Sequence, residues 1–250
     1  MLADPRSGHA SILLVEDDPP VARMLTEVLE TSGYRVSHVE TGTDAKAMLD
    51  QTRPDLIVLD LMLPDADGLI LCSNLKSVAP EVPLIICSAL NQTRERVLSL
   101  KLGADDFIGK PFDIYEFEAR VEAVLRRSTH ASRATEHAAG PEEIRLGDLT
   151  LDRSRRRVTL GGEPLRLTPT EYRLLIALAS RPDEILTREE LAQLVWGYQD
   201  VSTGRTIDVH IRRLRVKLGS GPVPAPPIIS VRGFGYKIAP DTHRTTTSAA

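Results

Sequence analysis

Five short aliphatic runs alternate with stretches of helical period in the first half of the chain, and this alternation constrains the fold most. The runs are Ile12–Val15, Val36–Val39, Leu56–Leu59, Leu84–Cys87 and Phe107–Ile108. Between them, apolar residues recur at helical spacing, as in the segment Val21–Leu29. Runs that are apolar on both faces suit strands of a parallel sheet covered by helices on each side. We therefore predict a doubly wound (βα)5 domain over residues 11–127.

Residues 142–239 predict a different, α+β arrangement. Strand-like alternation at Ile144–Leu151 and Arg157–Leu160 leads into a Gly161-Gly162 turn, which indicates a hairpin. Capping-box spacings at Thr168/Glu171 and Thr187/Glu190 predict the starts of two helices. The expected elements from here on are helices over Pro169–Ser180, Thr187–Trp196 and Thr206–Leu218, and a second hairpin over Ile228–Ile238.

Composition bounds the remaining segments. Residues 128–141 are small, polar and without period, which indicates an interdomain linker, and we expect residues 1–10 and 240–250 to be disordered. No apolar run approaches the roughly 20 residues of a membrane span, so we expect a cytoplasmic protein without a membrane partner. Cys72 and Cys87 form no CxxC pair and lie in apolar sequence, which favours buried free thiols.

Charge is distributed unevenly along the chain. Residues 1–128 carry 13 Lys and Arg against 21 Asp and Glu, or −8, and residues 129–250 carry 18 against 14, or +4, which together give the total of −4. We therefore expect only the second half to bind a polyanion.

Polar side chains follow the strands at the edge where ligands of an open parallel sheet bind. Asp17 and Asp18 follow the first strand, Asp60 ends the third, and Ser88 and Lys110 follow the fourth and fifth. Carboxylates held together repel one another, and Mg²⁺ is the natural ion to relieve that repulsion. Metal, Ser88 and Lys110 would form a cradle for a phosphoryl group, with Asp60 as nucleophile. Taken alone, Asp18 before Pro19 would also suit a helix cap.

These residues lie in motifs that resemble the receiver domain of bacterial two-component response regulators, a flavodoxin/CheY-like fold. The motifs are Leu14–Asp18, Asp60–Gly68, Ser88-Ala89 and Gly103–Phe112. The resemblance implies that Asp60 accepts a phosphoryl group from a sensor histidine kinase, and that Asp17, Asp18, Asp60 and the backbone carbonyl of Met62 hold Mg²⁺. It also implies that Lys110, before a cis peptide bond to Pro111, pairs with the phosphoryl oxygens, and that Ser88 and Phe107 are the switch residues. Because Phe107 lacks the hydroxyl of the commoner tyrosine, we expect the switch to work by burial alone.

An aspartate-nucleophile phosphohydrolase is a rival interpretation of the same acidic cluster. Such enzymes carry a second aspartate two positions after the nucleophile as general acid and base. Met62 occupies that position here and cannot transfer a proton. The sequence therefore favours a persistent acyl phosphate, which serves a signalling switch and not an enzyme.

The segment Arg205–Leu218 carries the strongest indication of nucleic-acid binding. Its apolar residues fall in one stripe (Ile207, Ile211, Leu214 and Leu218), and Arg205, Val209, Arg212 and Val216 lie opposite. A hairpin with Arg232 and Tyr236 follows, which together indicates a winged helix-turn-helix. The basic run Arg153–Arg157 lies in the leading sheet, where a solvated turn is favoured.

Residues 144–238 resemble the effector domain of OmpR/PhoB-type response regulators. The resembling motifs are Leu167–Leu175, Leu186–Leu191, Val195–Tyr198, Arg205–Arg215 and Val231–Tyr236. The resemblance implies that the Gly197–Gly204 loop faces RNA polymerase. The DNA contacts that it implies are Arg205, Val209, His210, Arg212, Arg213, Arg215, Ser230, Arg232 and Tyr236.

Receivers of this family dimerise through the fourth helix, the fifth strand and the fifth helix. The charge pairs that would match across the two-fold are Arg96 with Glu116, Asp106 with Arg120 and Asp105 with Arg127, around an apolar centre at Val97 and Leu100. Each surface pair would contribute roughly 0–1 kcal/mol and set register more than affinity. We expect a phosphorylation-activated transcription regulator that binds promoter half-sites as a homodimer. The alternative is a constitutive DNA-binding protein whose receiver serves only to dimerise.

Overall fold

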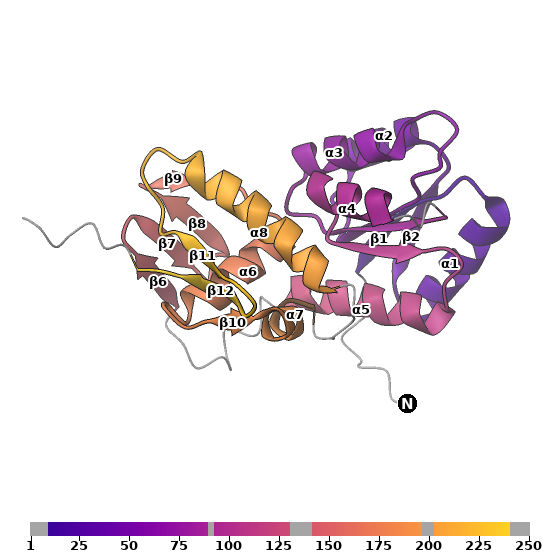
Figure 1. Cartoon of the computed structure of the whole chain (residues 1–250). Coiled ribbons are helices and arrows are strands. Elements are labelled where there is room, and N and C mark those ends of the chain that lie inside the picture. Colours follow the sequence, from indigo (N-terminus) through magenta and orange to yellow (C-terminus); the bar gives the residue numbers. More distant parts are fainter. Residues whose placement is uncertain (1–9, 90–92, 131–141, 197–202, 241–250) are drawn as a thin grey trace, which may run out of the picture. The chain divides into compact units, whose positions relative to one another are not determined.

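The chain folds into two compact units, Met1–Thr129 and His130–Ala250, drawn together in Figure 1 and described separately below. The structure is a computed structural model that describes residues 10–89, 93–130, 142–196 and 203–240. The ends predicted to be disordered lie outside these ranges, apart from residues 10 and 240, and so does residue range 131–141 of the predicted linker.

The first unit is built on a parallel five-stranded sheet in the order β2-β1-β3-β4-β5. The strands are β1 (Ser11–Val15), β2 (Arg35–Val39), β3 (Leu56–Leu59), β4 (Leu84–Ser88) and β5 (Asp106–Gly109). The helices are α1 (Pro19–Thr31), α2 (Gly42–Gln51), α3 (Gly68–Val78), α4 (Thr93–Leu102) and α5 (Ile114–His130). The predicted doubly wound (βα)5 fold is therefore confirmed.

Helices cover both faces of this sheet, with α2, α3 and α4 on one side and α1 and α5 on the other (Figure 1). Every residue of β3 is buried, which explains why its run is aliphatic throughout. Leu25 of α1 and Phe117 of α5 pack against alternate strand residues in one apolar cluster. Both faces are thus occupied by packing, and the carboxyl edge of the sheet is left for polar chemistry.

Helix α5 is longer than the sequence indicates. It continues to His130, so residues 128–130, which were assigned to the linker, are helical instead. Low apolar content and small residues do not end a helix by themselves, because propagation adds one backbone hydrogen bond per residue once the helix has formed.

The second unit combines two antiparallel sheets with three helices. The four-stranded sheet runs in the order β6 (Glu143–Leu146), β7 (Leu149–Asp152), β8 (Arg157–Leu160), β9 (Glu163–Pro164). The helices are α6 (Pro169–Ala179), α7 (Arg188–Trp196) and α8 (Thr203–Gly219). The three-stranded sheet has the order β10 (Leu186–Thr187), β12 (Gly235–Ile238), β11 (Ile228–Val231). This arrangement confirms the predicted winged helix-turn-helix.

The predicted strand Ile144–Leu151 is in fact two strands, β6 and β7, joined by a tight turn. Gly147 has φ of 56°, a left-handed conformation that glycine adopts without strain. Leu146 and Leu149 face each other across the hairpin. The Gly147-Asp148 pair was the turn signal in the sequence, and the apolar alternation on either side concealed it.

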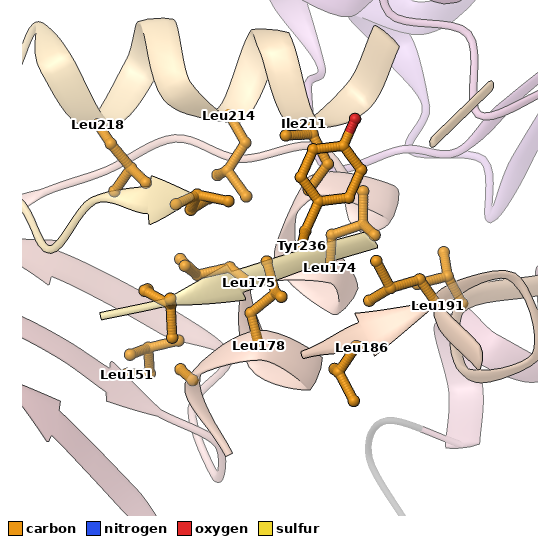
Figure 2. Packing of buried hydrophobic residues seen from close by; sticks show 14 of the residues in the cluster. Leu151, Leu174, Leu175, Leu178, Leu186, Leu191, Ile211, Leu214, Leu218 and Tyr236 are labelled. Carbon is orange, nitrogen blue, oxygen red and sulfur yellow. The ribbon is translucent and has the colours of Figure 1, made fainter. Parts of the chain in front are cut away.

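One apolar core joins the helices of the second unit (Figure 2). Leu174 and Leu178 of α6 and Ile211 and Leu214 of α8 all belong to it, and all are fully buried. Thr168 and Glu171 form the predicted capping box at the start of α6. The apolar face of α8 is therefore fixed to α6, and the opposite face is turned outward.

Candidate functional site

Three carboxylates converge at the carboxyl edge of the parallel sheet. Glu16, Asp17 and Asp60 each offer an oxygen atom, and these atoms lie within 4.8 Å of one another. Glu16 and Asp60 are only 1% and 5% exposed. They follow β1 and β3, which are neighbours at the point where the strand order reverses, the usual ligand site of an open α/β sheet.

Lys110 links two of these carboxylates directly. Its Nζ donates to Glu16 Oε1 and Oε2 at 2.9 and 2.7 Å and to Asp60 Oδ2 at 2.6 Å. The residue follows β5, and its peptide bond to Pro111 is cis, as the resemblance implied. Burial by itself would lower the pKa of Lys110, but the hydrogen bonds to Asp60 and Glu16 outweigh it and raise that pKa. Lys110 therefore stays charged at neutral pH.

The cluster as a whole retains an excess of negative charge. Burial raises the pKa of Glu16, and the nearby charge of Asp60 adds to that rise, while Lys110 opposes it. The cluster gathers three carboxyl groups around one ammonium group. A hard divalent cation with oxygen ligands, such as Mg²⁺, fits this donor set.

Asp18, predicted as a metal ligand, belongs to a helix cap instead. Its Oδ1 accepts a hydrogen bond from the backbone N–H of Val21 at 3.3 Å, and its side chain is exposed. Pro19 and Pro20 occupy the first positions of α1, which makes Asp18 the N-cap. Glu16, which was not predicted as a ligand, lies in the cluster with Asp17 and Asp60, and Asp18 is not part of that cluster.

The turn after Asp60 holds this carboxylate in place. The backbone N–H of Met62 donates to Asp60 Oδ1 at 2.9 Å, while the Met62 side chain is 54% exposed. A Cβ atom on Gly68 would lie 2.3 Å from Leu61 Cα, so the turn closes only with glycine there. Both oxygens of Asp60 are thus positioned by the chain, one by Met62 and one by Lys110.

The same turn is fixed to the neighbouring helix. Asp65 accepts hydrogen bonds from the backbone N–H groups of Gly42 and Thr43 at 2.8 and 3.0 Å, at the start of α2. The bond from Gly42, followed by that from the Thr43 hydroxyl, lowers the pKa of Asp65. The loop that carries Asp60 is therefore held at both ends.

The two predicted switch residues are both buried. Ser88 ends β4 and is 0% exposed, and Phe107 on β5 is 3% exposed. The Phe107 ring is thus already buried in this structure. Cys87 and Cys72 are buried free thiols, as predicted, and burial raises the pKa of Cys87 to about 12.

The predicted dimer charges form contacts within the chain. Arg120 lies 3.1 Å from Asp106 and 2.7 Å from Glu116. Asp105 is 1% exposed and lies 3.1 Å from Nζ of Lys76, which contradicts its assignment to a surface pair.

The apolar centre of the predicted dimer face differs as well. Leu100 is 2% exposed and turned inward, whereas Leu98 is 37% exposed. Val97 and Arg96 are half-buried. The Arg127 side chain lies outside the described residues.

Two predicted DNA contacts on α8 are buried. Val209 is 9% exposed and His210 is 0% exposed, with the His210 ring 5.8 Å from that of Trp196. His210 lies three residues after Ile207 and four before Leu214, on the same apolar face, so helical spacing could have excluded it. Helix α7 packs against α8, a tertiary contact that a helical wheel does not show.

Four other predicted contacts make bonds within the domain, although two of them, Arg215 and Ser230, remain exposed. Arg213 lies 3.1 Å from the buried Glu171, and Arg215 donates to the backbone carbonyl of Ile228. Arg215 also donates to the Ser230 hydroxyl at 2.9 Å, and Tyr236, 4% exposed, donates to Asp208 at 2.6 Å.

Other residues of this face remain open. Arg212 and Arg232 are exposed, as predicted for DNA contacts. Val216, which was predicted to lie on this outer face, and Phe234, which was not singled out, are each 65% exposed. The Arg205 side chain lies outside the described residues.

Comparisons with known proteins agree with this architecture. Residues 12–122 match the response regulator receiver domain, and residues 162–238 match the C-terminal domain of transcriptional regulatory proteins. The chain is 39% identical over 229 residues to the DNA-binding response regulator MtrA of Mycolicibacterium smegmatis, covering 92% of this chain and 96% of that protein. It is 40% identical to the transcriptional regulatory protein AfsQ1 of Streptomyces coelicolor, over 92% and 98% of the two chains. A solved RitR mutant aligns with a TM-score of 0.76 at 30% identity, over 93% and 100% of the chains.

A receiver fold with an acidic edge, joined to a winged helix-turn-helix, defines a phosphorylation-dependent transcription regulator. The chain belongs to the response regulators of the OmpR/PhoB type. In the part of the chain that the structure describes, no helix has both the length and the apolar character needed to cross a membrane.

Proposed function

We propose that Asp60 accepts a phosphoryl group from a sensor histidine kinase and that this modification controls DNA binding by the second unit. The placement of Asp60 carries the proposal. Its carboxylate lies at the carboxyl end of β3, 2.6 Å from Lys110 Nζ and within one cluster with Glu16 and Asp17. Glu16, Asp17, Asp60 and the backbone carbonyl of Met62 would hold Mg²⁺, which neutralises phosphoryl oxygens when bound.

The chemistry is a phosphoryl transfer in which an oxygen of Asp60 forms the new bond to phosphorus. The bond from phosphorus to the kinase's histidine nitrogen breaks, and that nitrogen keeps the electron pair. The ammonium group of Lys110 would pair with the phosphoryl oxygens. The hydroxyl of Ser88, at the end of β4, would donate a hydrogen bond to one of these oxygens. The Met62 side chain cannot act as a general acid, so the acyl phosphate persists.

Substitutions at two neighbouring aspartates test the assignment of the metal ligands. Asp17→Asn should abolish the Mg²⁺ dependence of phosphorylation by acetyl phosphate, because it removes a carboxylate of the cluster. Asp18→Asn should leave that dependence unchanged, since asparagine also caps a helix well. The measurement is phosphorylated fraction against Mg²⁺ concentration, by intact-protein mass spectrometry. Equal loss in both variants would restore Asp18 as a ligand.

The face that would read DNA combines α8 with the tip of the β11–β12 hairpin. Arg212 and Val216 point outward from α8 and suit a major groove, where arginine meets guanine or phosphate and an aliphatic group meets a thymine methyl. Arg232 at the hairpin tip suits the adjacent minor groove. Phe234 beside it adds an exposed aromatic surface.

Partners follow from the same two units. We propose that the phosphorylated chain forms a homodimer through α4, β5 and α5, which would place two α8 helices on paired half-sites. In this dimer, the ion pairs that Arg120 makes with Asp106 and Glu116 within the chain would be replaced by ion pairs across the two-fold axis. RNA polymerase is proposed as a further partner through the Gly197–Gly204 loop, of which residues 197–202 lie outside the described part.

Duplex affinity with and without a phosphoryl mimic tests this function. The chain would first select a duplex from random sequence, and its affinity would be measured with and without beryllium fluoride and Mg²⁺. We expect tightening by about tenfold, within the range of a typical coupling between sites. Equal affinities in the two conditions would favour the constitutive regulator, with the receiver as a dimerisation module.

A further inference from the structure

Tyr236 on β12 lies between two guanidinium groups. The Cζ atom of Arg188 is 5.1 Å from its ring centroid and that of Arg215 is 5.6 Å away. Arg188 begins α7, and Arg215 belongs to α8. Both distances are within the range of a cation–π contact. One aromatic ring thus joins two helices to the hairpin, and Figure 2 shows it next to Ile211 of α8.

The hydroxyl of Tyr236 adds a directional bond to the same place. It donates to Asp208 Oδ1 at 2.6 Å, and Arg188 donates to that same oxygen at 2.9 Å. Arg188 also reaches the Tyr236 hydroxyl at 3.4 Å. Burial, followed by the hydrogen bond to Asp208, raises the pKa of Tyr236, so the hydroxyl keeps its proton and remains a donor.

Arg215 extends this group to the outer strand of the hairpin. Its Nε and one terminal nitrogen donate to the backbone carbonyl of Ile228 at 3.0 and 2.7 Å, and the same terminal nitrogen donates to the Ser230 hydroxyl at 2.9 Å. Ile228 and Ser230 lie on β11, which pairs with β12. Bonds from α7 and α8 therefore reach both strands of the hairpin.

We propose that Arg188, Asp208, Arg215 and Tyr236 form a helix–wing lock that sets the position of the hairpin tip relative to α8. In this assignment they are positioning residues, and they do not contact DNA. The inference rests on the proposed DNA-binding function and deepens it. A duplex must receive α8 in one groove and Arg232 in the next at the same time, so a fixed spacing lowers the cost of ordering both.

A double-mutant cycle between the lock and the hairpin tip tests the proposal. Tyr236→Phe removes only the hydroxyl, and Arg232→Ala removes the guanidinium that the lock would position. Each change alone should weaken binding of the selected duplex about tenfold, within the usual effect of one charge-assisted hydrogen bond. The double variant should bind about as weakly as either single variant, because Arg232 contributes only when it is held in place.

Two results would overturn the lock. A loss of duplex affinity of about one hundredfold in the double variant, the product of the two single losses, would mean that Tyr236 acts independently of the hairpin tip. A direct DNA contact would behave in this way. Unchanged affinity for Tyr236→Phe would mean that the hydroxyl positions nothing. Asp208→Ala removes the acceptor of the same hydrogen bond. Because the Asp208 side chain is 48% exposed, this variant should keep its fold.

Controls separate the lock from general destabilisation and from failure of the function. Tyr34→Phe makes the same chemical change at a half-buried ring between α1 and β2, outside the second unit and outside the proposed dimer elements, and it should leave affinity unchanged. The thermal midpoint of the second unit, followed by the fluorescence of Trp196, reports any loss of fold. If the chain without substitutions selects no duplex even with beryllium fluoride and Mg²⁺, the proposed function fails. If it selects one and the cycle is additive, only the lock fails.

Discussion

Asp60→Asn should take up no phosphoryl group, from either acetyl phosphate or a histidine-kinase domain. The amide of asparagine keeps the size of the carboxylate and its contact with Met62, but it is not a nucleophile for phosphorus. The substitution also leaves Lys110 bonded to Glu16 alone, since the charge on Asp60 is lost. The readout is the mass of the intact protein after incubation with phosphodonor and Mg²⁺.

A matched carboxylate outside the cluster provides the control. Asp50→Asn changes an exposed residue of α2, and the variant should be labelled like the original chain. Labelling of the Asp60 variant at the level of the Asp50 variant would refute the acceptor assignment. Labelling at another residue of the Asp60 variant would show up on peptide mapping and would identify the true acceptor.

Lys76→Met should lower the free energy of unfolding of the receiver unit by about 3–5 kcal/mol, the usual cost of breaking a buried ion pair on one side. Lys76 and Asp105 side chains are 3% and 2% exposed. The ammonium also donates to the carbonyls of Pro80 and Val82, at 2.9 and 2.7 Å, so its removal costs those two acceptors a donor as well. The pair ties the end of α3 to the start of β5.

An exposed ion pair in the same unit offers the comparison. Arg53 and Glu81 are 3.6 Å apart, and their side chains are 64% and 65% exposed. Arg53→Met should therefore change stability by no more than about 1 kcal/mol. Hydrogen exchange of β4 amides during urea titration follows the receiver, because the chain's single tryptophan, Trp196, reports the other unit. Similar effects of the two substitutions would contradict the burial argument.

The sequence predicted best those parts of the fold that depend on local residue patterns. Aliphatic runs with helical intervals determine a covered parallel sheet, and the predicted strands agree with the observed ones within a residue or two. Strand predictions failed where a turn interrupts an apolar alternation in the sequence. The alternation across Ile144–Leu151 fitted one strand, although Gly147 permits a left-handed turn that folds it into two.

The acidic cluster shows that the position of an acidic residue after a strand does not by itself identify it as a metal ligand. Residues 16–18 are three acids in a row, and the resemblance was taken to imply that Asp17 and Asp18 hold the metal. The Asp-Pro-Pro sequence contained the answer, because a proline at N1 makes the preceding Asp18 the N-cap. Glu16 belongs to the same quoted motif, Leu14–Asp18, but was given no role in the prediction.

Most predicted DNA contacts could not be judged from the sequence. Arg213 and Arg215 resemble reading residues on a helical wheel, yet their partners, Glu171 and Ile228, are remote in the sequence. Only tertiary packing reveals that these arginines are engaged within the domain. The dimer charges follow the same pattern, because Asp105 has Lys76 as an intrachain partner 29 positions away.

Helix α8 assigns its basic residues to two separate duties. Arg213 and Lys217 bind Glu171 and Arg215 binds the hairpin, whereas Arg212 and Val216 project outward. If Arg212 and Val216 read DNA as proposed, operator preference can diverge after gene duplication by exchange at these two positions while the scaffold is kept. Changes at 213 or 215 would instead be filtered out through loss of stability. Under the proposed function, a regulator of a different set of genes can therefore arise by substitution at a few positions of α8 that the core does not need.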